Sequence, residues 1–142
     1  TAMAFGYSLT IAQIPQMAGN SLLALTSNPY IILFLINIFL LFIGLFMEST
    51  AAMLILIPIF MPVVNQMGID PVQFGIIMVL NLMIGTITPP VGVVLSVTGN
   101  VANVSFDRVA KATAPFLIPL IIVLLLVTYV PYITLFLPSL FN

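Results

Sequence analysis

The stretch that most constrains this chain is 85–92, with the sequence GTITPPVG, which separates the apolar runs 74–84 and 93–97. Neither run alone can cross a bilayer, because a spanning helix needs roughly 20 apolar residues. Two consecutive prolines remove two backbone donors, and a proline disfavours helix in the residue before it. The sequence therefore predicts one transmembrane helix over 71–104 that is broken at 85–92. The alternatives are a proline-kinked structural helix and a loop between two short helices.

A break of this kind has functional consequences inside a membrane. Each bare peptide group in lipid costs several kcal/mol, so a break persists only inside protein or beside a polar cavity, where transporters bind ions and substrate. Carbonyls at the end of the first half can ligate a hard cation such as Na⁺, and the second half points its positive dipole at an anion. Thr86 and Thr88 flank Ile87, so in an extended break their hydroxyls would point the same way. The break is a candidate site for a cation and an anion together.

The composition indicates the class of protein. Of the 142 residues 63% are hydrophobic and only 4% are charged, whereas about a quarter of a soluble domain is charged. We therefore expect an all-α integral membrane protein in a lipid bilayer. The net charge of −1 gives no basic surface for nucleic acid. Histidine and cysteine are absent and no apolar run holds two carboxylates, so we expect no enzyme. The chain opens without a methionine and is expected to be a piece of a longer protein.

Two apolar runs, 31–47 and 51–67, are joined by Glu48-Ser49-Thr50. One continuous helix over both would be about 55 Å long, and two complete crossings would need a turn at the membrane surface. The favoured prediction is a re-entrant hairpin over 29–67 with its tip, 48–50, buried in protein. Glu48 is then an acid inside the membrane, which suggests a functional site. The alternative is a glutamate near the interface or a protonated one, with neighbouring hydroxyls that only pack helices.

The remaining segments complete a multi-pass topology. We expect 1–28 to hold the end of a preceding helix and an amphipathic arm helix, and 112–138 to be a transmembrane helix. Arg108 and Lys111 are the only cations, which favours a cytoplasmic position for their loop and an outer position for 68–71. Polar residues inside the apolar helices are expected to be mostly structural; these are Asn81, Thr98, Asn100 and Asn103.

Several motifs in a fixed order resemble one family. They are GLFMESTAAMLILIP at 44–58, GIDP at 68–71, FG at 74–75 and GTITPPVG at 85–92. Together they are similar to the C-terminal part of the large membrane subunit, of DctM or SiaM type, of TRAP transporters (tripartite ATP-independent periplasmic transporters). The resemblance covers essentially the whole chain.

This resemblance implies a Na⁺-coupled importer of organic acids, of the sialic acid or C4-dicarboxylate class, in the bacterial inner membrane. It implies two partners, a small membrane subunit and a periplasmic binding protein. It also implies an elevator-type fold with inverted repeats, of which this chain would be most of the second, with 112–138 returning to the scaffold. A stand-alone sodium–dicarboxylate symporter of the same fold, or a structural subunit without its own site, remain alternatives.

The resemblance also implies the site residues. A Na⁺ site would lie between hairpin tip and helix break, with many ligands being backbone carbonyls; its residues would be Glu48, Ser49, Thr50, Gly85, Thr86, Thr88, Pro89 and Gly92. The substrate would contact Ser49, Thr50, Thr88 and Pro90. The family commonly has an aspartate where Glu48 stands, which leaves open whether this side chain ligates Na⁺ or whether carbonyls and hydroxyls do.

Overall fold

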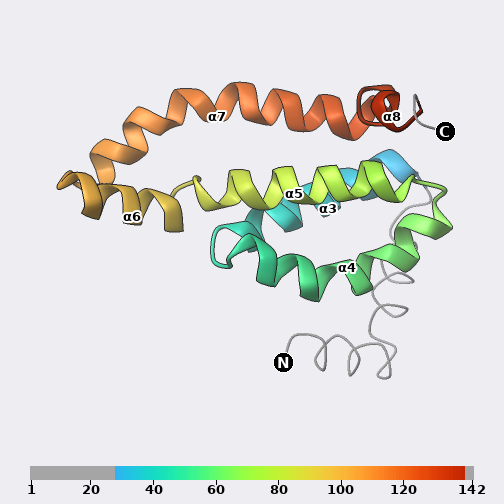
Figure 1. Ribbon diagram of the computed structural model, residues 1–142, viewed down its shortest axis with the longest axis horizontal. Coiled ribbons are helices and arrows are strands. Elements are labelled where there is room, and N and C mark those ends of the chain that lie inside the picture. Colours follow the sequence, from blue (N-terminus) through green and yellow to red (C-terminus); the bar gives the residue numbers. More distant parts are fainter. Residues whose placement is uncertain (1–27, 140–142) are drawn as a thin grey trace.

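The computed structural model describes residues 28–139, and the predicted arm helix falls outside them. Between residues 28 and 139 the chain is helical without any strand, which confirms the all-α prediction. Three segments are long and apolar enough to cross a membrane: Pro29–Phe46, Ser49–Gln66 and Phe106–Tyr129. The helices, labelled in Figure 1, are α3 (Pro29–Gly44), α4 (Ser49–Gln66), α5 (Pro71–Thr86), α6 (Val93–Ala102), α7 (Phe106–Tyr129) and α8 (Pro131–Ser139).

α3 and α4 form an antiparallel hairpin, so 31–67 is not one continuous helix (Figure 1). Asn28 accepts a hydrogen bond from the Tyr30 N–H at 3.0 Å and caps α3, as expected for an asparagine before Pro29. The turn that joins the helices is 45–48, so it begins three residues before the predicted tip at 48–50 and shares only Glu48 with it. The difference arises because Glu48 caps α4, which draws the next two residues into its first helical turn.

α5 and α6 are the two halves of the broken helix. Asp70 and Pro71 begin α5 with a capping carboxylate and a proline at the first position. α5 continues through Thr86, so Gly85 and Thr86 belong to the helix and the non-helical segment is 87–92. The break therefore begins two residues later than predicted.

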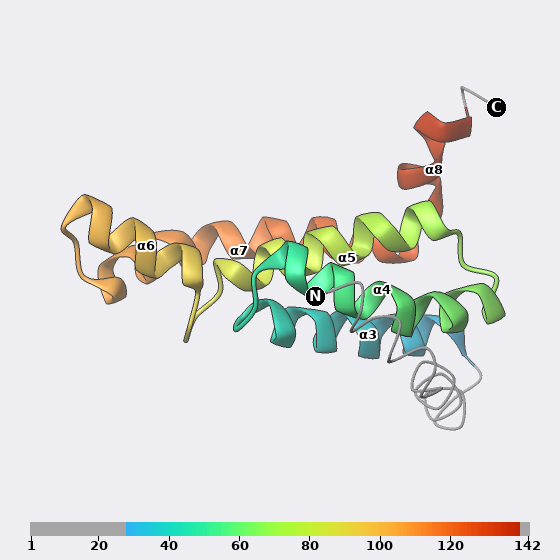
Figure 2. The same ribbon diagram turned by 60° about the horizontal axis from the view of Figure 1, so that its bottom comes forward.

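The predicted single helix over 112–138 is wrong at both ends. α7 begins six residues earlier, at Phe106, with Asp107 in its first turn, where a negative charge favours the helix dipole. It ends at Tyr129, and a second helix, α8, begins at Pro131 and leaves the bundle at a steep angle (Figure 2). The cause is local: proline has no N–H to continue a helix, and Val130 before it leaves the helical region with φ −117° and ψ 83°.

The core lies where α5 packs against the hairpin. Its fully buried side chains come from α3, α4 and α5, and the rings of Phe60 and Phe74 meet edge to face with centroids 6.2 Å apart. The hairpin turn lies beside the point where α5 gives way to α6, whereas α6 and the first half of α7 extend beyond it (Figures 1 and 2). The hairpin, with α3 about 24 Å long, thus ends midway along the α5–α6 pair.

Candidate functional site

The hairpin turn and the helix break are held together by a contact between two glycines. A Cβ atom on Gly85 would lie 2.6 Å from the Gly44 Cα and 2.9 Å from the Leu41 carbonyl oxygen. Because real Cβ atoms do not approach backbone so closely, only glycine permits this crossing of α3 and α5. The end of α3, the start of α4 and the end of α5 therefore meet at one place, beside the break.

Glu48 caps the first turn of α4. One carboxylate oxygen accepts the Thr50 N–H at 2.8 Å and the Thr50 hydroxyl at 2.9 Å, and the other accepts the Ala51 N–H at 3.0 Å. Three of the donors that would otherwise face outward at this helix end are thereby satisfied. The capping role is a local one that neither sequence interpretation of Glu48 included.

Of the three predicted tip residues, the described chain buries only Ser49, while Glu48 and Thr50 are exposed. The Ser49 hydroxyl donates to the Met83 sulfur at 3.6 Å and links the start of α4 to the last turn of α5. Ser49 thus faces the last turn of α5, whereas the Thr50 hydroxyl bonds Glu48.

The two threonines of the break are arranged as the tightened end of a helix. The Thr86 hydroxyl donates to the Met83 carbonyl at 2.7 Å, and the Thr88 hydroxyl donates to the Ile84 carbonyl at 2.6 Å. The Thr88 N–H also bonds the Gly85 carbonyl at 3.0 Å, so the backbone here is not extended and that expectation is wrong. Each hydroxyl uses its hydrogen in one hydrogen bond, and each oxygen keeps lone pairs that can face a cation.

The second half of the break ends at an unusual cap. Gly92 has φ +45° and precedes α6, whose first turn has no side-chain cap. This left-handed conformation favours glycine, and an added Cβ would also lie 2.8 Å from the Leu95 side chain and 3.2 Å from the Thr88 carbonyl oxygen. Pro89 and Pro90 are exposed on the loop between the halves. The α6 N–H groups are therefore oriented toward the break, where an anion is favoured.

The donor set decides which ion could fit here. Among the described residues no group of three or more His, Cys, Asp or Glu side chains occurs. The oxygen atoms near the break are the Thr86 and Thr88 hydroxyls and the carbonyls of the last turn of α5. Neutral oxygens of this kind suit a hard cation such as Na⁺, and they do not suit a transition metal.

A buried polar seam, made by Asn37, Gln73, Asn81 and Thr128, joins α3, α5 and α7. The Asn81 amide donates to the Asn37 side-chain oxygen, and Asn37 donates to the Thr128 hydroxyl at 3.1 Å. Gln73 donates to the Thr128 carbonyl at 3.1 Å. Of these four residues only Asn81 was expected to be structural, and its hydrogen bonds to Asn37 and to the Ile77 carbonyl agree with that. A lone amide inside the run 31–47 was the available signal for Asn37.

The hairpin, the broken helix and the apolar exterior define the class: a multi-pass α-helical membrane protein. The family model described as "Tripartite ATP-independent periplasmic transporter, DctM component" matches residues 1–133. The chain belongs to this DctM family, and it is therefore a protein of the bacterial inner membrane.

Curated relatives agree with this family. The sialic acid TRAP transporter large permease SiaM of Vibrio cholerae is 46% identical over 96% of this chain and 32% of its own length. The C4-dicarboxylate permease DctM of Pseudomonas aeruginosa is 45% identical over 97% of the chain and 32% of its own length. The isethionate permease DctMQ of Oleidesulfovibrio alaskensis is 47% identical over 95% and 21%. The chain thus spans a third or less of these relatives.

Proposed function

We propose that this chain forms most of the second repeat of a Na⁺-coupled importer of organic acids. The observation that carries the proposal is the Gly44–Gly85 contact, which brings the hairpin turn beside the helix break. In this proposal Na⁺ binds at the end of α5, where the Thr86 and Thr88 oxygens and the last carbonyls are close together. Gly85, Pro89, Gly92 and the start of α4 complete its surroundings.

The acid group of the substrate would bind next to this ion. The first turn of α6 has no side-chain cap, so its N–H groups can receive a carboxylate beside Thr88 and Pro90. The first N–H groups of α4 already bond Glu48, which makes α6 the better of the two helix ends. Ser49, buried against α5, is the hairpin residue best placed to contact both ligands.

The class of substrate and the partners follow from the relatives. Their names specify sialic acid, a C4-dicarboxylate and isethionate, all of which are organic acids, and the family name specifies a tripartite system. We therefore propose a small membrane subunit and a periplasmic binding protein as partners. A stand-alone symporter of the same fold would take up its substrate without the soluble protein, so uptake by vesicles with and without it separates the two.

The mechanism we propose is a sliding motion of the site across the membrane. The hairpin ends midway along the α5–α6 pair (Figure 2), which supports the proposal of a re-entrant hairpin with a site at mid-depth. The buried bonds from Asn37 and Gln73 to Thr128 favour α7 moving together with the hairpin and α5. This departs from the expectation that the last helix belongs to the scaffold, because buried hydrogen bonds would have to break at every sliding step.

The site is tested by a matched pair of threonines in the full-length transporter. Thr88 and Thr98 each donate to the carbonyl four residues earlier, at 2.6 and 2.8 Å, but only Thr88 lies at the break. In vesicles, Thr88→Val should raise the Na⁺ concentration for half-maximal uptake by about tenfold or more. Thr98→Val should leave it unchanged. An unchanged Na⁺ dependence in Thr88→Val would contradict the proposed site.

A further inference from the structure

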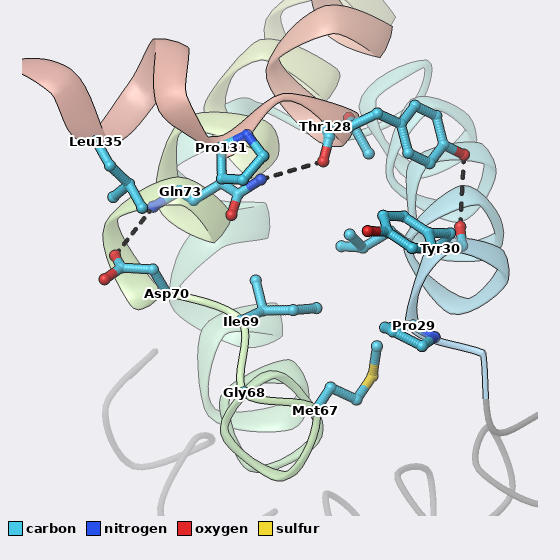
Figure 3. A pocket seen from close by; sticks show the side chains of 12 residues that line it. Pro29, Tyr30, Met67, Gly68, Ile69, Asp70, Gln73, Thr128, Pro131 and Leu135 are labelled. Carbon is cyan, nitrogen blue, oxygen red and sulfur yellow. Dashed lines mark hydrogen bonds between the residues drawn. The ribbon is translucent and has the colours of Figure 1, made fainter.

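A cavity, shown in Figure 3, lies at the open end of the hairpin, at the opposite end of α5 from the break. Its volume is about 340 Å³, and it lies where α3 begins, where α4 turns into α5 and where α7 turns into α8. Leu33, Ile69 and Leu135 give it apolar walls. None of the residues that line this cavity belongs to the proposed Na⁺ and substrate site.

Two side chains of this cavity, Gln73 and Asp70, present acceptor oxygens. Gln73 is only 6% exposed. Its amide N–H₂ donates to the Val127 and Thr128 carbonyls at 3.3 and 3.1 Å. These bonds fix the amide so that its oxygen points into the cavity (Figure 3). At the rim, Asp70 uses Oδ1 to cap α5 at 2.7 Å from the Val72 N–H, which leaves Oδ2 for a ligand. The cavity therefore calls for a ligand with N–H or O–H donors.

The charge and the aromatic groups specify a cation. Asp70 is the only charged residue that lines the cavity, and both cations of the chain, Arg108 and Lys111, lie at the other end of the bundle. The rings of Tyr30 and Tyr129 form a further wall, with centroids 6.0 Å apart. A carboxylate, an amide oxygen and two tyrosines are the groups that bind an ammonium ion.

The surface around the cavity indicates where that ammonium comes from. Tyr30 and Ile31 at the start of α3 and Tyr132 and Ile133 at the start of α8 are 60, 48, 71 and 52% exposed. Tyrosines beside aliphatic side chains are typical of the depth at which lipid headgroups lie. We propose that the cavity binds the primary-ammonium headgroup of phosphatidylethanolamine, with its acyl chains along the exposed apolar surface of α3 and α8.

The test uses the purified full-length transporter in nanodiscs of defined lipid, followed by native mass spectrometry of the lipids that remain bound. Asp70→Asn keeps a capping oxygen for α5 and removes the charge, and Asp107→Asn removes one charge at the opposite end as a matched control. Phosphatidylethanolamine should bind about tenfold more weakly to Asp70→Asn, the effect of losing one charge-assisted hydrogen bond. Asp107→Asn should retain it as the unmodified protein does.

Competing lipids identify the chemistry. Phosphatidylcholine has a cationic headgroup without N–H donors, and phosphatidylglycerol has no cation, so both should be retained less than phosphatidylethanolamine. Equal retention of the three lipids, or equal retention by the Asp70 and Asp107 variants, would overturn the proposal. Asp70→Ser provides a second variant with a capping oxygen, and the thermal unfolding temperature of both variants establishes that they are folded.

Discussion

Two of the contacts between α3 and α5 are built differently. Midway along the helices, Asn37 and Asn81 meet through their side chains, both fully or almost fully buried. At the ends beside the break, Gly44 and Gly85 meet through their backbones, with no side chain between them. The asparagine contact joins the helices by a hydrogen bond between side chains, whereas the glycine contact brings the two backbones together directly.

The difference separates holding from binding along one pair of helices. The Asn37 amide group is committed, since its nitrogen bonds the Leu33 carbonyl at 2.9 Å and Thr128, and its oxygen accepts from Asn81. Near the glycine contact, the Thr86 and Thr88 hydroxyls each donate one hydrogen bond, and their oxygens can still accept a hydrogen bond or ligate a cation. The seam thus fixes the register of the helices, and the glycine contact leaves oxygen atoms accessible for an ion.

The largest expected effect comes from adding a methyl group to the glycine contact. Gly85→Ala would place a Cβ 2.6 Å from the Gly44 Cα, where backbone rather than a flexible side chain must move. Overpacking of this kind costs about 1–3 kcal/mol, and the hairpin turn would move away from the break. We expect a lower unfolding temperature in detergent and loss of Na⁺-dependent uptake.

Gly75 provides the control for this variant on the same helix. A Cβ there would meet nothing within 4 Å, so Gly75→Ala should stabilise α5 by about 0.5–1 kcal/mol and leave uptake intact. If Gly85→Ala transports as well as Gly75→Ala, the glycine contact does not position the site.

An intermediate effect is expected from the seam. Asn81→Leu would leave the Asn37 side-chain oxygen buried without its donor, at about 1–3 kcal/mol of the free energy of unfolding. The Asn81 side-chain oxygen has no partner in the described residues, so replacing both asparagines by leucine should cost less than the sum of the two single changes. A double-mutant cycle by thermal or denaturant unfolding measures this coupling.

The seam variants also test the separation of holding from binding. Asn100→Leu, an exposed position on α6, is the matched control and should change stability little. In Asn81→Leu the Na⁺ dependence of uptake should stay close to that of the unmodified protein, because no seam residue lies at the break. A large change in Na⁺ dependence would mean that the seam belongs to the site.

How much the sequence predicts depends on how local the signal is. The break was found because Pro89 and Pro90 act on their own backbone. A hairpin was favoured because one helix over 31–67 would be about 55 Å long, too long for a single crossing. The seam was mostly missed because its partners are far apart in the chain, 44 positions for Asn37 and Asn81 and 91 for Asn37 and Thr128. No periodicity or motif in a single sequence encodes such a pairing.

Errors at helix ends have a different cause. The predicted tip was displaced from the observed turn at 45–48 because Glu48 was interpreted as a charge in an apolar region, although it could also cap the following helix. The end of α7 was missed because hydrophobicity continues through Pro131, and backbone chemistry ends the helix there. Hydrophobic patterning predicts which segments enter the membrane, whereas capping and proline decide where each helix stops.

The smallest effect is expected at Glu48, which lies at the site although its side chain is already engaged in hydrogen bonds, as the side chains of the seam are. Its carboxylate already accepts three donors from the first turn of α4, so we expect it to hold the turn and not to ligate Na⁺. Glu48→Gln keeps one acceptor oxygen and gives up one bond, and the Na⁺ concentration for half-maximal uptake should change by no more than about twofold. Thr50→Val, which removes only the hydroxyl bond, is the matched control. If Glu48→Gln instead weakens Na⁺ dependence as strongly as Thr88→Val, the carboxylate is a ligand, and holding and binding coincide at the hairpin turn.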